Sequence, residues 1–166
     1  ILQDWKEVAY ALEGPGGIYQ QISVGIMDDG WWWEMSTNYN YGVGRNLTRT
    51  GLALRPWGVE MLEDRFPASY HNSVTAYSTP GEPEKEFRER EGSGVFAAKW
   101  GPTKRNYRQV RDLWDCLIPM INEDGLAPGL NDSPPERDVG VGEFTRAAYA
   151  YGDPEYLRRA SSENLF

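Results

Sequence analysis

The stretch DDGWWWEMSTNYNYG, residues 28–42, concentrates side chains that can hold and act on a polar ligand. Its three consecutive tryptophans present flat apolar faces, which suit the C–H faces of sugar rings. Tyr39, Asn38 and Asn40 offer directional hydrogen bonds to hydroxyl and carboxylate groups. This combination favours a carbohydrate as the ligand.

The three indoles also carry a structural argument. On a helix, Trp31, Trp32 and Trp33 would point in directions about 100° apart, so one neighbouring element could hardly bury all of them. We therefore expect at least one indole to face a cleft. The competing interpretation is that these aromatic residues plug helix ends as ordinary core residues.

Two segments in this sequence form a recognisable pair. The first matches a pattern of Asp-Gly, aromatic positions, Glu, Ser and Tyr at Asp29, Gly30, Glu34, Ser36 and Tyr39. The second, INEDGLAPGLNDS, matches a Gly-x-x-Pro-x-x-Asn-Asp-Ser loop at Gly125, Pro128, Asn131, Asp132 and Ser133, and AAYAYGDPEYL follows it. Together they resemble the helical domain of the heparinase II/III-like polysaccharide lyases, which include alginate and oligoalginate lyases. The resemblance spans roughly residues 20–157.

The resemblance implies an all-α fold, part of an incomplete (α/α) toroid of helical hairpins with long loops. Residues 1–166 are then expected to be a fragment of the toroid, with an irregular insertion at 67–98. The remainder of the toroid and a C-terminal β-domain are expected from the parent chain.

The resemblance also implies a reaction: β-elimination that cleaves an acidic polysaccharide or oligosaccharide next to a uronic acid, without a cofactor. It assigns the proton transfer to Tyr39. A free phenol has a pKa near 10, so nearby cations or donors would have to favour its phenolate, and Arg45 and Arg49 are the candidates. The substrate-binding residues expected are Trp31, Trp32, Trp33, Glu34, Asn38, Asn40, Tyr41, Arg45, His71 and Asn131.

The residue that neutralises the uronate carboxylate in such lyases lies before the tyrosine, where this sequence offers only Gln20 and Gln21. We therefore expect that residue upstream of Ile1. His71 and Asn72 have suitable side chains but follow the tyrosine.

Two alternatives to a lyase stay open. Asp28, Asp29 and Glu34 permit a glycoside hydrolase with paired carboxylates, since helical toroids also host such enzymes. A non-catalytic glycan-binding fragment is the other alternative. Asn131 and Asp132 fit either function, and a Pro-Gly loop with Asn and Asp is also ordinary turn chemistry.

Helical spacing of apolar residues predicts the elements that position these groups. Helices are expected over 1–14, over 18–27, over 40–55 up to Pro56, over 103–121 with Thr103 as the cap, and over 139–152, closed by Gly152. The glycines at 42, 44 and 51 would let the third of these helices pack closely. Residues 122–138, NEDGLAPGLNDSPPERD, are expected to be a turn-rich loop. Runs of strict polar and apolar alternation are missing, which favours helical hairpins over a sheet protein.

Length and composition set the remaining limits. The 166 residues amount to about one domain, and a net charge of −8 argues against nucleic acid as a partner. No apolar run approaches the length that membrane insertion needs. One His and one Cys far apart cannot form a dedicated transition-metal site, so no metal is expected. We expect a periplasmic or secreted location, although the sequence contains no signal segment.

Overall fold

The structure is a computed structural model, and it describes residues 4–27, 29–67, 107–138 and 141–160. The chain divides into two compact units. The first comprises residues 1–28 and 66–108, and the second comprises residues 29–65 and 109–166. The predicted insertion at 67–98 lies, apart from Pro67, outside the described residues.

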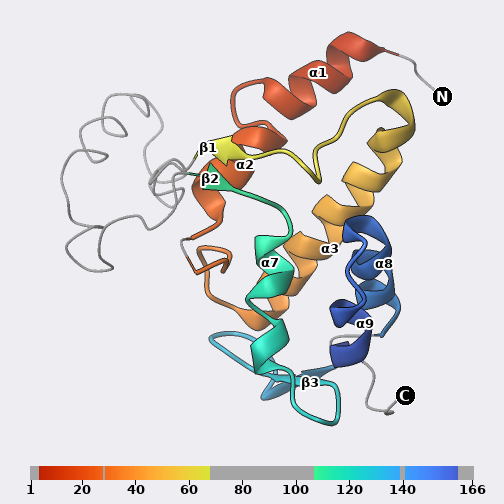
Figure 1. The fold of residues 1–166 in the computed structure, drawn as a ribbon. Coiled ribbons are helices and arrows are strands. Elements are labelled where there is room, and N and C mark those ends of the chain that lie inside the picture. Colours follow the sequence, from red (N-terminus) through yellow and green to blue (C-terminus); the bar gives the residue numbers. More distant parts are fainter. Residues whose placement is uncertain (1–3, 28, 68–106, 139–140, 161–166) are drawn as a thin grey trace, which may run out of the picture. The chain divides into compact units, whose positions relative to one another are not determined.

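The first unit contains a helical hairpin and a short strand pair (Figure 1). Helix α1 (Trp5–Glu13) is capped by Asp4 and helix α2 (Ile18–Gly25) follows a glycine-rich turn, so both predicted helices are confirmed. Strand β1 (Phe66–Pro67) pairs antiparallel with β2 (Tyr107–Arg108). The side chains of Gln20 and Gln21 both bond to the backbone of Gly16 and so fasten the turn between the helices.

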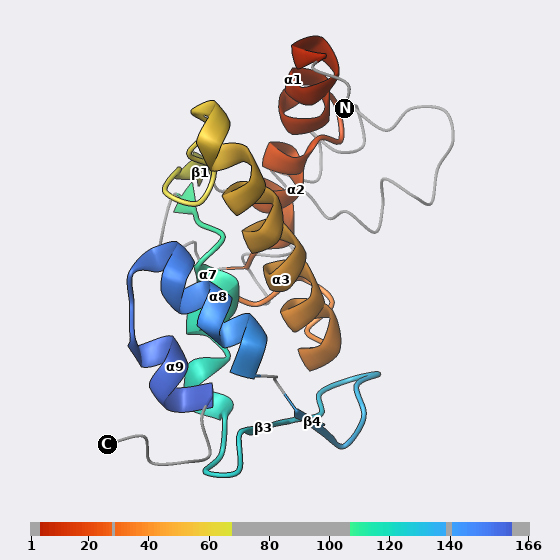
Figure 2. The ribbon, with the colours of Figure 1, turned by 90° about the vertical axis from the view of Figure 1, so that its right-hand side faces the viewer.

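The second unit is built around helix α3 (Thr37–Leu54), which continues into a 3₁₀ turn, η1 (Arg55–Trp57). Helix α7 (Asp112–Asp115) and helix α8 (Val141–Tyr151) both pack on α3, and α9 (Glu155–Ala160) packs on α8 (Figures 1 and 2). A second 3₁₀ turn, η2 (Ile118–Met120), leads into the antiparallel strands β3 (Leu126–Pro128) and β4 (Glu136–Asp138).

Helix α3 turns one stripe of residues toward the interior: Thr37, Asn40, Tyr41, Gly44, Thr48 and Gly51 are buried. Tyr41 meets Trp114 edge to face, and Trp114 meets Phe144 of α8 in the same way. At Gly51 an added Cβ would lie 2.4 Å from the Leu62 side chain, which is itself buried. The predicted close packing through glycine is therefore confirmed at Gly51.

The prediction of one helix over 103–121 is wrong for the described residues. Tyr107 and Arg108 form a strand instead, and only Asp112–Asp115 is α-helical. The Asp112 carboxylate accepts a hydrogen bond from the Gln109 backbone N–H, which starts the helix late, and Pro119 cannot donate within it. Val110, Leu113, Trp114 and Leu117 are still buried, because successive short turns preserve the apolar spacing that suggested a long helix. Thr103 lies outside the described residues.

The other predicted helices are confirmed, with small shifts in their ends. α3 begins at Thr37 rather than residue 40, and α8 ends at Tyr151, just before Gly152, whose φ of 64° lies in the left-handed region that glycine adopts readily. The loop expected over 122–138 instead contains the β3–β4 hairpin. The fold is mostly helical, and no helix in the described part of the chain has the length and apolar character to cross a bilayer.

Candidate active site

The segment that precedes α3 folds back onto that helix. The Trp32 backbone N–H donates to Asn40 Oδ1 at 2.7 Å, and the amide nitrogen of Asn40 donates to the Leu113 carbonyl at 2.8 Å. Gly30 has a φ of 89°, and an added Cβ would lie 2.5 Å from the carbonyl oxygen of Asp112. A residue with a side chain would be strained there, so the Asp-Gly pair of the first motif serves a tight turn.

Ser36 starts α3 and fixes the residue that the sequence singles out. Its hydroxyl accepts a hydrogen bond from the Tyr39 backbone N–H at 3.4 Å, as an N-cap does. Tyr39 therefore lies in the first turn of the helix, where 41% of its surface is exposed. The Tyr39 side chain therefore extends from the capped start of α3 and reaches solvent.

The second motif lies against this helix end, although the two segments are more than ninety positions apart. We call residues 128–133 the docking loop. Thr37 Oγ1 donates to the Pro128 carbonyl at 2.6 Å and accepts from the Leu130 N–H at 3.2 Å. Ser133 Oγ lies 2.9 Å from Ser36 Oγ and accepts from the Asn38 N–H at 2.8 Å. The loop thus satisfies one of the free N–H groups of the helix start, that of Asn38.

Backbone strain is concentrated where the two segments meet. Outside glycine, Met35 and Asn131 are the residues with positive φ in the described part of the chain, at 54° and 53°. The Asn131 amide donates to the carbonyl of Glu34, the residue before Met35, at 2.8 Å. Gly129 completes the loop, since an added Cβ would lie 1.7 Å from the Pro134 carbonyl oxygen. Such strain is typical of functional sites.

Acidic groups surround the Tyr39 phenol. A hydrogen bond with Asp132 is the largest of the influences that raise the pKa of Tyr39 above its ordinary value, followed by the negative charge of Asp132; the charge of Glu34 adds to it. The proximity of anions disfavours the phenolate. At neutral pH Tyr39 therefore keeps its proton, and the expectation that the surroundings favour its phenolate is wrong.

The two arginines expected to favour the phenolate differ in their surroundings. Arg49 pairs with Glu143 of α8. The Nε atom of Arg45 is buried without a hydrogen-bond partner in the described structure. Arg45 stays a predicted substrate-binding residue, and Arg49 is engaged in holding α3 to α8.

Three of the predicted substrate-binding residues lie in the interior. Trp31 and Tyr41 are 8% and 5% exposed and belong to the main hydrophobic cluster of the second unit. Asn40 is fully buried and uses its oxygen and its nitrogen to hold Trp32 and Leu113. These three residues are therefore better placed to support the site from the interior than to contact a ligand.

The remaining predicted residues lie nearer the surface. Trp32, Trp33 and Asn38 are partly exposed, and Glu34 and Asn131 are exposed. The Trp32 indole N–H donates to the Glu34 carboxylate at 3.1 Å, which orients that ring. The three indoles precede α3 and do not share a helix, so one is buried and two are partly open. His71 and Asp28 lie outside the described residues.

Sequence reasoning considered Asp132 only together with Asn131, and it missed Thr37. The Asn-Asp-Ser signature marked the docking loop, but nothing in the spacing of the sequence could pair Asp132 with Tyr39.

Among the described residues, no group of three or more His, Cys, Asp or Glu side chains is arranged to hold a metal ion. Burial raises the pKa of the Cys116 thiol to about 12, so this cysteine is no nucleophile at neutral pH.

A scan against models of known protein families found no match, and neither did searches of curated proteins and of solved structures. The functional argument therefore rests on the residues of this chain and their arrangement.

Proposed function

We propose that this protein is a polysaccharide lyase that cleaves a uronate-containing glycan by β-elimination, with Tyr39 as the proton-transfer residue. One observation carries the proposal. The two segments that resemble heparinase II/III-like lyases lie against each other, and their contact holds Tyr39 at the exposed start of α3 beside Asp132.

The neighbouring side chains suit a sugar. Trp32 and Trp33 leave part of their indole rings open for stacking on sugar C–H faces, and Trp32 is oriented by Glu34. Asn38 and Asn131 add amide groups that can bind hydroxyls. Tyr39 supplies the group that moves a proton between C5 and the departing O4.

The architecture proposed is a fragment of an incomplete (α/α) toroid. The α1–α2 and α8–α9 pairs are helical hairpins of the kind from which toroids are assembled. In this proposal the intact protein supplies the remaining hairpins, the β-domain and the group that neutralises the uronate carboxylate.

A glycoside hydrolase is the second candidate, and one observation favours it. Glu34 and Asp132 both place negative charge near Tyr39, and such surroundings repel a uronate but not a neutral sugar. Glycosidases also use a pair of carboxylates for catalysis.

One experiment separates the two candidates. The intact protein is incubated with alginate, heparan sulfate, hyaluronan and ulvan, and with neutral glycans, while absorbance of the C4–C5 double bond and release of reducing ends are followed together. The proposal predicts both signals on a uronate-containing glycan. Reducing ends without absorbance would establish the hydrolase, and neither signal together with glycan binding would leave a non-catalytic binding protein.

A further inference from the structure

Two serine hydroxyls accept hydrogen bonds from consecutive N–H groups at the start of α3. Ser36 Oγ accepts from the Tyr39 N–H at 3.4 Å, and Ser133 Oγ accepts from the Asn38 N–H at 2.8 Å. The two serine oxygens lie 2.9 Å apart, so one hydroxyl donates to the other. We call Ser36 and Ser133 the two-serine cap. An ordinary N-cap uses the residue next to the helix, whereas half of this cap comes from a residue 97 positions away.

Other contacts bring the second serine of this cap into place. Thr37 bonds to the backbone of Pro128 and Leu130, and Asn131 bonds to the Glu34 carbonyl. Figure 2 shows the β3–β4 hairpin, which contains the docking loop, at the end of α3 where the helix begins. These bonds hold the loop without using the serine at its end. The loop should therefore stay docked when that serine loses its hydroxyl.

The first turn of α3 needs such a restraint. Helix ends fray, because their first N–H groups have no partner within the helix. Tyr39 is the third residue of α3, and its ring is 41% exposed, so packing restrains the ring little. At 3.4 Å the bond from the Tyr39 N–H to Ser36 is long, whereas the bond from the Asn38 N–H to Ser133 has an ordinary length of 2.8 Å. Ser133 thus supplies the shorter of the two bonds that hold this turn.

We propose that Ser133 is a positioning residue for Tyr39, because its hydroxyl completes the two-serine cap and fixes the helical turn from which the phenol extends. This inference rests on the proposed lyase function. Proton transfer to or from carbon requires the phenolic oxygen close to the C–H bond and aligned with it, and a misplacement of about 1 Å can cost roughly 10²-fold in rate. Ser133 acts on the rate through the backbone of Asn38 and Tyr39 and need not touch the substrate.

The test compares Ser133→Ala and Ser133→Thr with a control, Thr50→Ala, in the intact protein. The Thr50 hydroxyl donates to the Asn46 carbonyl at 2.9 Å, so the control also removes a hydroxyl hydrogen bond from α3. Thr50 lies roughly 16 Å along the helix from Tyr39. The remaining bonds of the docking loop should keep the melting temperature of Ser133→Ala within about 5 °C of the wild-type value.

The first readout is amide hydrogen exchange of Asn38 and Tyr39, measured by NMR. Loss of the Ser133 hydroxyl should speed exchange at both amides by about three- to tenfold, because the Asn38 N–H loses its acceptor and the first turn opens more often. Ser133→Thr keeps a hydroxyl and should stay close to the wild-type rate. Thr50→Ala should leave both amides unchanged. This readout does not depend on any lyase activity.

The second readout is kcat and KM on the glycan that the wild-type enzyme cleaves, well below the melting temperature of every variant. We expect kcat of Ser133→Ala to fall roughly tenfold, since the phenol is less often in line with the C–H bond. KM should stay within about twofold, because other side chains bind the glycan in this proposal. Ser133→Thr should recover most of the rate, and Thr50→Ala should match the wild-type enzyme.

The outcomes separate this inference from the lyase proposal. Wild-type exchange at Asn38 and Tyr39 in Ser133→Ala overturns the role of Ser133. Faster exchange with wild-type kcat overturns it as well, since the cap would then be structural only. A loss of kcat that Ser133→Thr does not recover also contradicts it. Absence of unsaturated product from the wild-type enzyme on every uronate glycan overturns the lyase function, while the exchange rates still decide whether Ser133 holds the backbone of Tyr39.

Discussion

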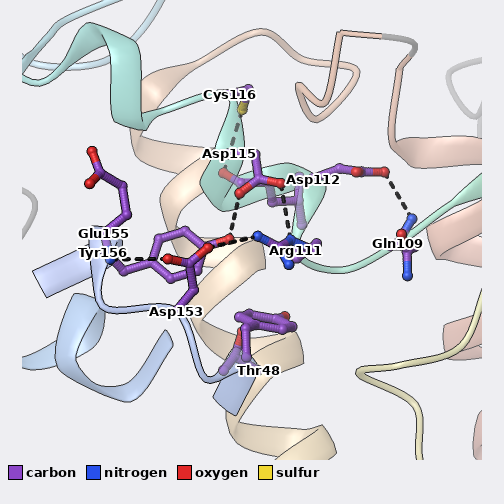
Figure 3. Close-up of polar contacts among 11 residues, drawn as sticks. Thr48, Gln109, Arg111, Asp112, Asp115, Cys116, Asp153, Glu155 and Tyr156 are labelled. Carbon is purple, nitrogen blue, oxygen red and sulfur yellow. Dashed lines mark hydrogen bonds and ion pairs between the residues drawn. The ribbon is translucent and has the colours of Figure 1, made fainter. Parts of the chain in front are cut away.

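The second unit contains two tyrosines, Tyr156 and Tyr39, in opposite settings. Tyr156 of α9 is fully buried and donates to Asp115, and Arg111 bonds to the same carboxylate and to Asp153 (Figure 3). The Arg111 guanidinium also lies over the Tyr151 and Tyr156 rings, 5.6 and 5.8 Å from their centroids. Tyr39, by contrast, is 41% exposed, and the groups that shift its pKa are acidic.

The difference shows which tyrosine is available for chemistry. Around Tyr156 a cation balances the carboxylates, and burial foremost raises the pKa of the phenol, as expected for a group that joins helices. Around Tyr39 the charges that raise the pKa of the phenol, those of Asp132 and Glu34, are both negative, and the ring reaches solvent. The Tyr156–Asp115 hydrogen bond joins α9 to α7, whereas the Tyr39 phenol carries a proton at the protein surface.

The largest effect is expected where the candidate site meets the core. Trp31→Ala should lower the free energy of unfolding by about 3–5 kcal/mol, because a buried indole is replaced by a cavity. Trp33→Ala should cost less than about 1 kcal/mol, since that ring is partly exposed, and it should instead weaken glycan binding. Urea unfolding and a binding titration measure the two effects. Equal destabilisation by both variants would contradict this division.

The two tyrosines should also differ in stability when each loses its hydroxyl. Tyr156→Phe removes the hydrogen bond from a buried hydroxyl to the charged Asp115 carboxylate, which keeps its ion pair with Arg111, so unfolding should become easier by about 1–3 kcal/mol. Tyr39→Phe removes a solvent-exposed hydroxyl and should change stability by less than about 0.5 kcal/mol. Chemical denaturation of the matched pair checks this. A larger loss from Tyr39→Phe would mean that the Tyr39 hydroxyl has a structural role.

The smallest effect is expected at a third carboxylate, Glu143, which lies between Arg49 and Arg146. Partial burial opposes ionisation, but the hydrogen bonds from the two arginines prevail and lower the pKa of Glu143 from its ordinary value. A lowered pKa contributes stability above the unfolded value that is lost as pH falls through the folded value. Glu143→Gln should therefore weaken the acid dependence of the melting temperature below about pH 4.5. An unchanged acid profile would show that the ion pairs contribute nothing measurable.

Local chemistry made much of the helical fold predictable. Pro56 and Gly152 act as a stop and a left-handed end, as predicted, and each acts through its own backbone neighbourhood. The prediction of one helix over 103–121 was wrong because Val110, Leu113 and Leu117 are buried at the same spacing in a helix and in successive turns. The strand pairing of Tyr107 with Pro67 depends on residues far away in the sequence.

The candidate site could be predicted only in part for the same reason. The sequence identified Tyr39 and the docking loop as separate motifs, but their contact depends on the fold of the intervening chain. The sequence could not show that the Asn40 side chain would form hydrogen bonds with the backbone of Trp32 and Leu113. Nor could it give the sign of the pKa shift of Tyr39, which depends on Asp132 rather than on the nearby arginines.

The most direct test of the central proposal is the turnover of Tyr39→Phe in the intact protein, on the uronate glycan that the wild-type enzyme cleaves. The substitution keeps the ring and removes only the group that moves the proton. We predict normal folding and a fall in kcat of roughly 10²-fold or more, measured by absorbance of the C4–C5 double bond. A folded Tyr39→Phe variant that retains wild-type turnover would contradict the account and direct the search for the proton-transfer group to other residues.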